Sequence, residues 1–153
     1  MDIYAYQRLV GRIDDNPELK ESFITIYDVK SHKEIVRFCL LLGQHLIERT
    51  GFTPAEEITS AFEAMNKWLE GKVNYHEARN LSLQISRIAR DEKDIVKVRF
   101  LRTMAQIAAS PHVKYHGLWA TDFAVTLINR MLPGDLDAVR LEREKHIELL
   151  QRV

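Results

Sequence analysis

Helix-capping residues divide the chain into short segments, and the helix ends that they mark constrain the fold more than any other sequence feature. Ser31 and Glu34 have the spacing of a capping box, in which each side chain bonds the backbone N–H of the other residue. Asn16-Pro17 is typical of an N-cap followed by proline at the first helical position, and Gly51 is typical of a left-handed C-cap. Together with similar signals, these residues predict helices over residues 17–29, 32–49, 53–70, 95–109 and 112–132. Two more helices are predicted to begin at residue 75 and at residue 136.

Apolar residues recur at helical spacing, as in Ile58, Ala61, Phe62, Met65 and Leu69, and no useful stretch alternates with a period of two. We therefore predict an all-α, single-domain bundle of about six or seven helices. We expect residues 1–34 to form an N-terminal helical segment, 35–132 the core, and 133–153 a charged helix packed on the same domain. For residues 1–14 a helix is favoured over a strand, because no second strand is available to pair with it.

Composition excludes several classes of function. The 22 basic residues balance 22 acidic ones, so net charge attracts neither nucleic acid nor an anionic membrane. Cys39 is the only cysteine, which excludes an intrachain disulfide and suits a reducing compartment. The N-terminus lacks the features of a signal peptide, and no run is apolar enough for a membrane span. A cytoplasmic location is expected.

Two histidines follow a proline break at Ser110-Pro111. On a helix that begins at His112, the side chains of His112 and His116 lie one turn apart and border the core. The same spacing occurs in helical zinc motifs, but Val113 replaces the glutamate of that motif and Asp122 points elsewhere. Three roles stay open for the pair, namely a structural role, contact with a partner, or metal binding by a metal-dependent enzyme.

Other catalytic or cofactor chemistry lacks support. Cys39 and His45 are six residues apart in one predicted helix, on different faces, so they form no nucleophilic dyad. The glycines are isolated, which removes the case for a phosphate loop. No cofactor is expected. A solvated, salt-bridged surface is favoured over contact with an acidic partner for the arginines of two successive helices, which are Arg79, Arg87, Arg90, Arg99 and Arg102.

The last predicted helix carries a thin apolar stripe among many charges, formed by Leu136, Val139, Arg143, Ile147 and Leu150. Its favoured interpretation is a terminal helix that lies on the core. A helical structural or adaptor protein that forms a homodimer through this helix is the alternative.

The stretch from Trp68 and Gly71 through Glu77-Ala-Arg79 and Ala89-Arg90 to Ile107–Ala124 resembles the bacterial immunity proteins with an Imm-5-like domain. A tryptophan-x-x-glycine turn, an alanine- and arginine-rich helix, and a later helix with two histidines four residues apart carry the resemblance. It covers about residues 35–130. The matching positions are Trp68, Gly71, Arg79, Arg90, His112, His116 and Phe123.

The resemblance implies an all-α protein, not an enzyme, that binds a toxin domain and blocks it by stoichiometric occlusion. Aromatic and arginine anchors on an otherwise polar surface would then provide specificity. The candidate contact residues are Arg90, His112, Tyr115, His116 and Trp119, together with Trp68 and Tyr75.

Overall fold

Seven helices make up the regular structure of residues 10–153, the range that the computed structural model describes. They are α1 (Pro17–Asp28), α2 (His32–Thr50), α3 (Glu56–Leu69), α4 (His76–Asp91), α5 (Ile95–Ala109), α6 (His116–Met131) and α7 (Leu136–Gln151). The described range contains no strand, which confirms the predicted all-α bundle. The expectation of a helix in residues 1–14 falls mainly on residues 1–9, outside the described range, and residues 10–14 are not helical.

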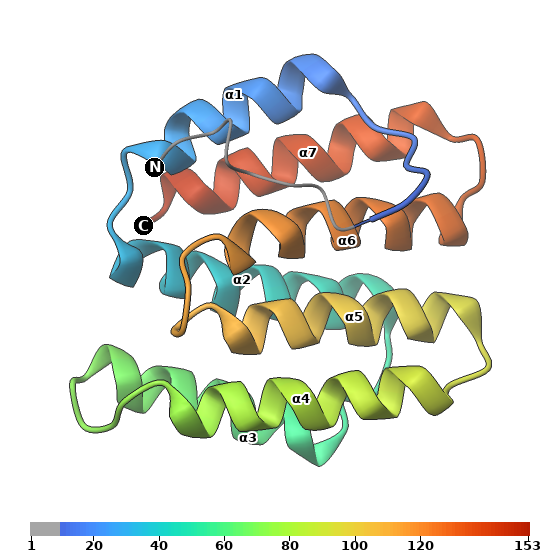
Figure 1. Ribbon diagram of the computed structural model, residues 1–153. Coiled ribbons are helices and arrows are strands. Elements are labelled where there is room, and N and C mark those ends of the chain that lie inside the picture. Colours follow the sequence, from blue (N-terminus) through green and yellow to red (C-terminus); the bar gives the residue numbers. More distant parts are fainter. Residues whose placement is uncertain (1–9) are drawn as a thin grey trace.

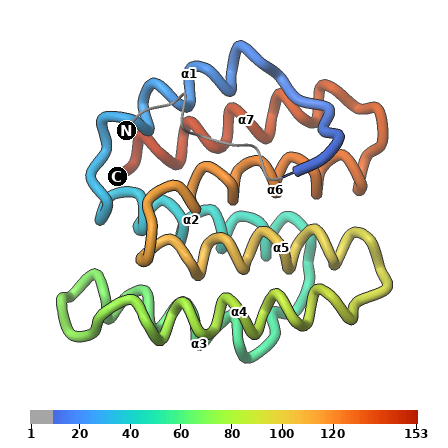
Figure 2. Tube along the Cα trace, viewed as in Figure 1, coloured from blue at the N-terminus to red at the C-terminus, as the bar shows by residue number. Residues whose placement is uncertain are grey.

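Neighbouring helices in the chain pack side by side through most of the bundle. Figure 1 shows α1, α7, α6, α5 and α4 one below another, with α2 behind α5 and α3 behind α4. The helix α2 contacts α3, α5, α6 and α7, so it forms the centre of the bundle. The Cα trace shows the short turns that reverse the chain between α3, α4, α5 and α6 (Figure 2). These reversals bring the α3–α4 and α5–α6 connections to the same end of the molecule.

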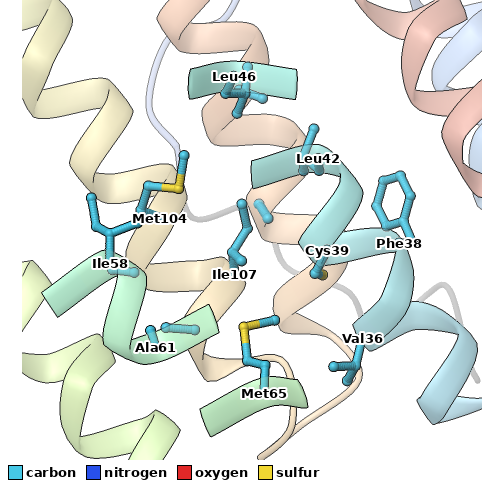
Figure 3. Packing of buried hydrophobic residues seen from close by; sticks show 14 of the residues in the cluster. Val36, Phe38, Cys39, Leu42, Leu46, Ile58, Ala61, Met65, Met104 and Ile107 are labelled. Carbon is cyan, nitrogen blue, oxygen red and sulfur yellow. The ribbon is translucent and has the colours of Figure 1, made fainter. Parts of the chain in front are cut away.

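The core is formed where α2, α3 and α5 meet. Figure 3 shows apolar side chains of these helices pointing toward one another, including Leu42 on α2, Met65 on α3 and Ile107 on α5. All three are fully buried. Cys39 is buried in the same cluster, and burial raises the pKa of its thiol to about 12. The thiol is therefore protonated and apolar in character at neutral pH.

Local capping fixes several helix ends as predicted. The Ser31 side chain accepts from the backbone of Glu34, and the Glu34 carboxylate accepts from the backbone of Ser31. Asn16 caps α1 ahead of Pro17, and Gly51 has a left-handed φ of 72° after α2. These contacts join residues at most four apart, which is why the sequence reveals them.

The predicted helix start at His112 is wrong, because α6 begins four residues later at His116. Ser110 keeps helical φ and ψ, but Pro111 has no backbone N–H to donate to the Ile107 carbonyl, and the chain continues as turns. The His112 N–H donates to the Ala109 carbonyl over 3.0 Å, and the His116 N–H donates to the Val113 carbonyl over 3.1 Å. These turns reverse the chain, so that α6 returns along α5.

A close approach fixes the start of α6 against α1 and α2. The Tyr27 hydroxyl donates to the Lys114 carbonyl, and Gly117 lies beside the Tyr27 ring and Ile35. A Cβ atom at Gly117 would lie 2.9 Å from the Ile35 Cγ2 atom. Only glycine fits there without displacing a neighbour, which explains why the second histidine is followed by a glycine.

The helix α7 packs against α1, α2 and α6. Leu149 and Leu150 are buried in the main core cluster. Leu136, expected on the buried stripe, is 62% exposed, whereas Arg143 of the same stripe is fully buried. The buried face of α7 is therefore apolar near its end and ionic in the middle.

Candidate functional site

The α5–α6 connection and the start of α4 form one end of the bundle (Figure 1). Ring side chains from these two segments contact one another in a chain that we name the histidine–aromatic row. Its members are Tyr75, His76, His112, Tyr115, His116 and Trp119. All are half-buried except His76, which is exposed. The row therefore lies at the boundary between core and surface.

Successive ring contacts connect α4 to α6. The Tyr75 ring centroid lies 4.5 Å from that of His112, and the His112 centroid lies 6.3 Å from that of His116. The His116 ring meets Trp119 edge-on with centroids 5.1 Å apart. Such tilted and edge-on contacts are the favoured aromatic geometries. The two histidines are therefore neighbours, although His112 lies in a turn and not on the helix.

Gln106 on α5 orients the ring of His116. The Nδ1 atom of His116 lies 2.7 Å from the Oε1 atom of Gln106, a carbonyl oxygen that can only accept. Burial, together with the nearby charges of His112 and Arg79, lowers the pKa of His116 to about 4. His116 is therefore neutral at pH 7, with its proton on Nδ1 and a lone pair on Nε2. It presents an acceptor to anything that approaches this nitrogen.

A second ring pair supports the row from α2 and α3. The Nε2 atom of His32 lies 2.7 Å from the Ser110 carbonyl oxygen, and the His32 ring lies 4.9 Å from the Trp68 ring. This links the starts of α2 and of the α5–α6 connection to the end of α3. There Gly71 turns the chain with a φ of 74°. Trp68 and Gly71 thus support the row without belonging to it.

The structure brings together most of the candidate residues and separates two of them. Of the contact candidates, His112, Tyr115, His116 and Trp119 lie in the row. Arg90 is exposed near the other end of α4, and Phe123 is buried on α6. Neither side chain takes part in the ring contacts that define the row.

No sequence signal marked His76, which joins the row by stacking on Tyr75 with centroids 4.4 Å apart. Gln106 was equally unmarked. It precedes His116 by ten residues and reaches it only because α5 and α6 pack antiparallel. No periodicity within one helix reports a contact between two helices.

The predicted salt-bridged arginine surface is wrong in one respect. Within residues 10–153, no ion pair joins Arg79, Arg87, Arg90, Arg99 or Arg102 to a carboxylate. The acidic residues between α4 and α5 are used locally instead. Asp94 caps α5, and Glu92 accepts from the backbone of Lys93 and Asp94. These bonds hold the carboxylates at the turn, away from the arginines.

A buried ionic cluster lies where α1, α6 and α7 meet. Arg143 donates to Asp15 through Nε and Nη2 over 2.9 and 2.7 Å, and its Nη2 lies 3.0 Å from Asp122. Lys20 also pairs with Asp122 at 3.0 Å. Although burial raises the pKa of Asp15, the bonds and charge of Arg143 outweigh it and hold that pKa below its ordinary value. The cluster ties residue 15 to α6 and α7.

Glu142 joins two histidines on α2 and α7. Its carboxylate lies 2.9 Å from His45 Nε2 and 2.6 Å from His146 Nε2. Burial lowers the pKa of His146, so this imidazole is neutral at pH 7 and donates its Nε2 proton to Glu142. Its Nδ1 atom is buried without a hydrogen-bond partner in the described residues. This network therefore contributes to the packing of α2 against α7.

The histidine pair lacks the further ligands that a metal centre needs. Among residues 10–153, histidine, cysteine, aspartate and glutamate nowhere gather as three or more side chains that could hold an ion. His112 and His116 therefore have no third ligand of these types within that range. None of the helices that the structure describes has the length and apolarity needed to cross a bilayer.

Comparison with known proteins identifies one family. The family model described as "Imm-5 like putative immunity protein" matches residues 25–153, most of the chain. The match extends beyond residues 35–130, where the motif resemblance lies, and includes α7. No curated protein and no solved structure matches the chain.

Proposed function

We propose that this chain, which belongs to the Imm-5-like immunity protein family, binds a toxin domain in the cytoplasm and blocks it by stoichiometric occlusion. Family membership gives the general role of an immunity protein. The mode of action and the contact surface are our proposal. The observation that carries them is the histidine–aromatic row, which gathers interface-type side chains at one end of the bundle.

The row has the chemistry of a binding anchor. Tyrosine, tryptophan and arginine dominate the energetics of protein interfaces, because they bury large areas and also form polar bonds. Tyr115 and Trp119 stack with centroids 6.3 Å apart, and Tyr75 extends the ring surface to α4. Neutral His116 adds an acceptor nitrogen. A partner that supplies an N–H or O–H donor and apolar contact area would be complementary to this surface.

The exposed face of α4 continues the surface away from the row. Arg79, Leu83, Arg87 and Arg90 fall within a sector of roughly 80° at 100° per residue, and all four are exposed. The three arginines lack ion pairs within the described residues, and Leu83 is 48% exposed. Arg90 thus contributes to binding from α4, as a companion of Arg79. Acidic side chains on the toxin domain would pair with this face.

Capture from lysate of the source organism tests the proposal when wild type is compared with two charge-reversal variants. Arg79→Glu/Arg90→Glu alters the proposed surface, and Arg37→Glu alters an exposed arginine on α2. Wild type and Arg37→Glu should retain one protein with a toxin-like domain. The double variant should lose it while keeping the wild-type melting temperature.

The captured partner is then purified, and the complex is weighed by light scattering. Occlusion requires a one-to-one complex and loss of toxic activity at equimolar protein. Alanine at Trp119 should weaken binding by roughly 30-fold, as expected for an interface anchor. Equal capture by all variants would exclude the proposed surface.

Metal analysis of the same eluate addresses the enzyme alternative. Recovery of the protein alone with near-equimolar zinc or iron, lost in His112→Ala/His116→Ala, would replace our proposal by the metal-dependent one.

A further inference from the structure

A pocket of about 290 Å³ lies at the far end of the α5–α6 pair from the histidine–aromatic row. The row is at the start of α6, and Arg130 of the pocket is in its last turn, roughly 21 Å along the helix. Arg12, Arg99 and Arg130 line the pocket together with Asp14 and Asn129. The pocket is therefore a separate site, and binding there does not depend on the proposed function.

The charges of the pocket do not cancel. Its lining contains the three guanidinium groups of Arg12, Arg99 and Arg130 and a single carboxylate, that of Asp14, which leaves a net charge of +2. None of these arginines forms an ion pair with a residue that the structure describes. In contrast, Arg143 on α7 is paired with Asp15 and Asp122. The positive charge of the pocket is thus uncompensated, unlike that of the buried Arg143.

The unfavourable burial and repulsion of positive charge in this pocket are clearest at Arg99. Its Nε atom is buried and has no hydrogen-bond partner among residues 10–153. Burial lowers the pKa of Arg99, and the nearby charges of Arg130 and Arg102 lower it further. A buried donor without a partner and mutually repelling cations both cost stability. An anion in the pocket would relieve both.

The pocket is held in shape by backbone contacts. The side chain of Asn129 accepts from the backbone N–H of Asp14 and donates to its carbonyl, each over 2.9 Å. This pair of bonds fixes the segment that carries Arg12 against α6. The cationic side chains therefore converge before any ligand arrives, which lowers the entropic cost of binding.

We propose that this pocket binds a phosphate group, free or carried by a small ester, through Arg99, Arg130 and Arg12. A phosphate monoester carries a charge of about −1.5 to −2 at pH 7, which matches the net charge of the lining, whereas a single carboxylate would neutralise only half of it. Guanidinium groups bind phosphate oxygens with paired, charge-assisted hydrogen bonds. The exposed carboxylate of Asp14 disfavours larger polyanions.

Titration of the full chain with inorganic phosphate, at an ionic strength matched with sodium chloride, tests this proposal by calorimetry and by thermal melting. We expect half-saturation in the low millimolar range. At ten times that concentration, the melting temperature should rise by about 3 to 6 °C. Acetate at the same ionic strength should leave it unchanged.

Variants locate the site. Arg99→Gln should weaken phosphate binding by roughly tenfold or more, because it removes a charged donor, and Arg130→Gln should do the same. Arg37→Gln, on the exposed face of α2, is the matched control and should bind as wild type does. In phosphate-free buffer, Arg99→Gln should melt at or above the wild-type temperature, since a repelling charge is lost.

Two results would overturn the proposal. One is an equal response to phosphate and to chloride or acetate at matched ionic strength. The other is unchanged phosphate binding in both Arg99→Gln and Arg130→Gln. A nucleoside monophosphate that binds more tightly than inorganic phosphate would identify the ligand as an ester, and the reverse order would identify it as the free ion.

Discussion

Replacing Arg143 by methionine should lower the free energy of unfolding by about 3–5 kcal/mol, because the change leaves buried carboxylates without their main counter-charge. Arg143 is fully buried, and it binds Asp15 and Asp122, whose side chains are 12% and 1% exposed. Methionine fills much of the volume of the arginine side chain, so the lost free energy of unfolding reflects the missing charge more than a packing defect. Asp122 keeps Lys20 at 3.0 Å, whereas Asp15 loses its two hydrogen bonds to Arg143.

In a domain of this size, each kcal/mol moves the melting temperature by about 2–4 °C, so Arg143→Met should melt roughly 6 to 20 °C below wild type. Urea unfolding at pH 7 measures the free energy directly. Arg140→Met is the matched control, one turn earlier on α7. Its pairs with Asp137 and Glu144 are exposed, so this variant should melt close to wild type.

A double-mutant cycle with Asp15→Asn separates the charge from the shape of Arg143. Because Asp15 loses its charge in the double variant, Arg143→Met should cost clearly less in that background than in wild type. Additive effects would show that the two side chains do not interact as described. A loss in Arg143→Met no larger than in Arg140→Met would refute the buried-charge reasoning altogether.

Three further predictions concern single residues. Wild type should lose stability as the pH falls from about 6.5 toward 4, because His116 takes up a proton in the unfolded chain and resists it in the folded one. The His116→Gln variant should lose less stability over the same range. Urea midpoints that change equally in wild type and variant would contradict this prediction. Gly117→Ala should destabilise the fold by about 1–3 kcal/mol, because its Cβ meets Ile35, whereas Gly11→Ala has open space and should change little in the same melting assay. The Cys39 thiol should react with Ellman's reagent only after unfolding in urea, since it is buried and its pKa is raised to about 12; rapid labelling of the native protein would show that it is accessible.

The candidate site was predictable only where its members are close in sequence. His112, Tyr115, His116 and Trp119 are within eight residues, and their proximity survives even though α6 begins at His116 instead of His112. The partners on other helices, among them Gln106, could not be predicted, because each contact depends on how two helices pack. The pocket lined by Arg12, Arg99 and Arg130 was invisible for the same reason.

The sequence by itself determined the helices and the all-α class. A cap such as Ser31 with Glu34 satisfies backbone groups within three or four residues, so its free energy depends on local order along the chain. The family resemblance was equally readable, because it rests on residue types at fixed spacing.

Only the tertiary structure decided which charges are buried and what they meet. Arg143 has the position of an apolar stripe residue, yet it is buried against Asp15, 128 positions away, and Asp122, 21 positions away. A buried charge is tolerated only where opposite charges and hydrogen bonds replace water, and that condition is met by the packing of α1, α6 and α7 together. No local sequence pattern predicts the burial of Arg143, since the groups that compensate its charge come from segments that meet only in the folded chain.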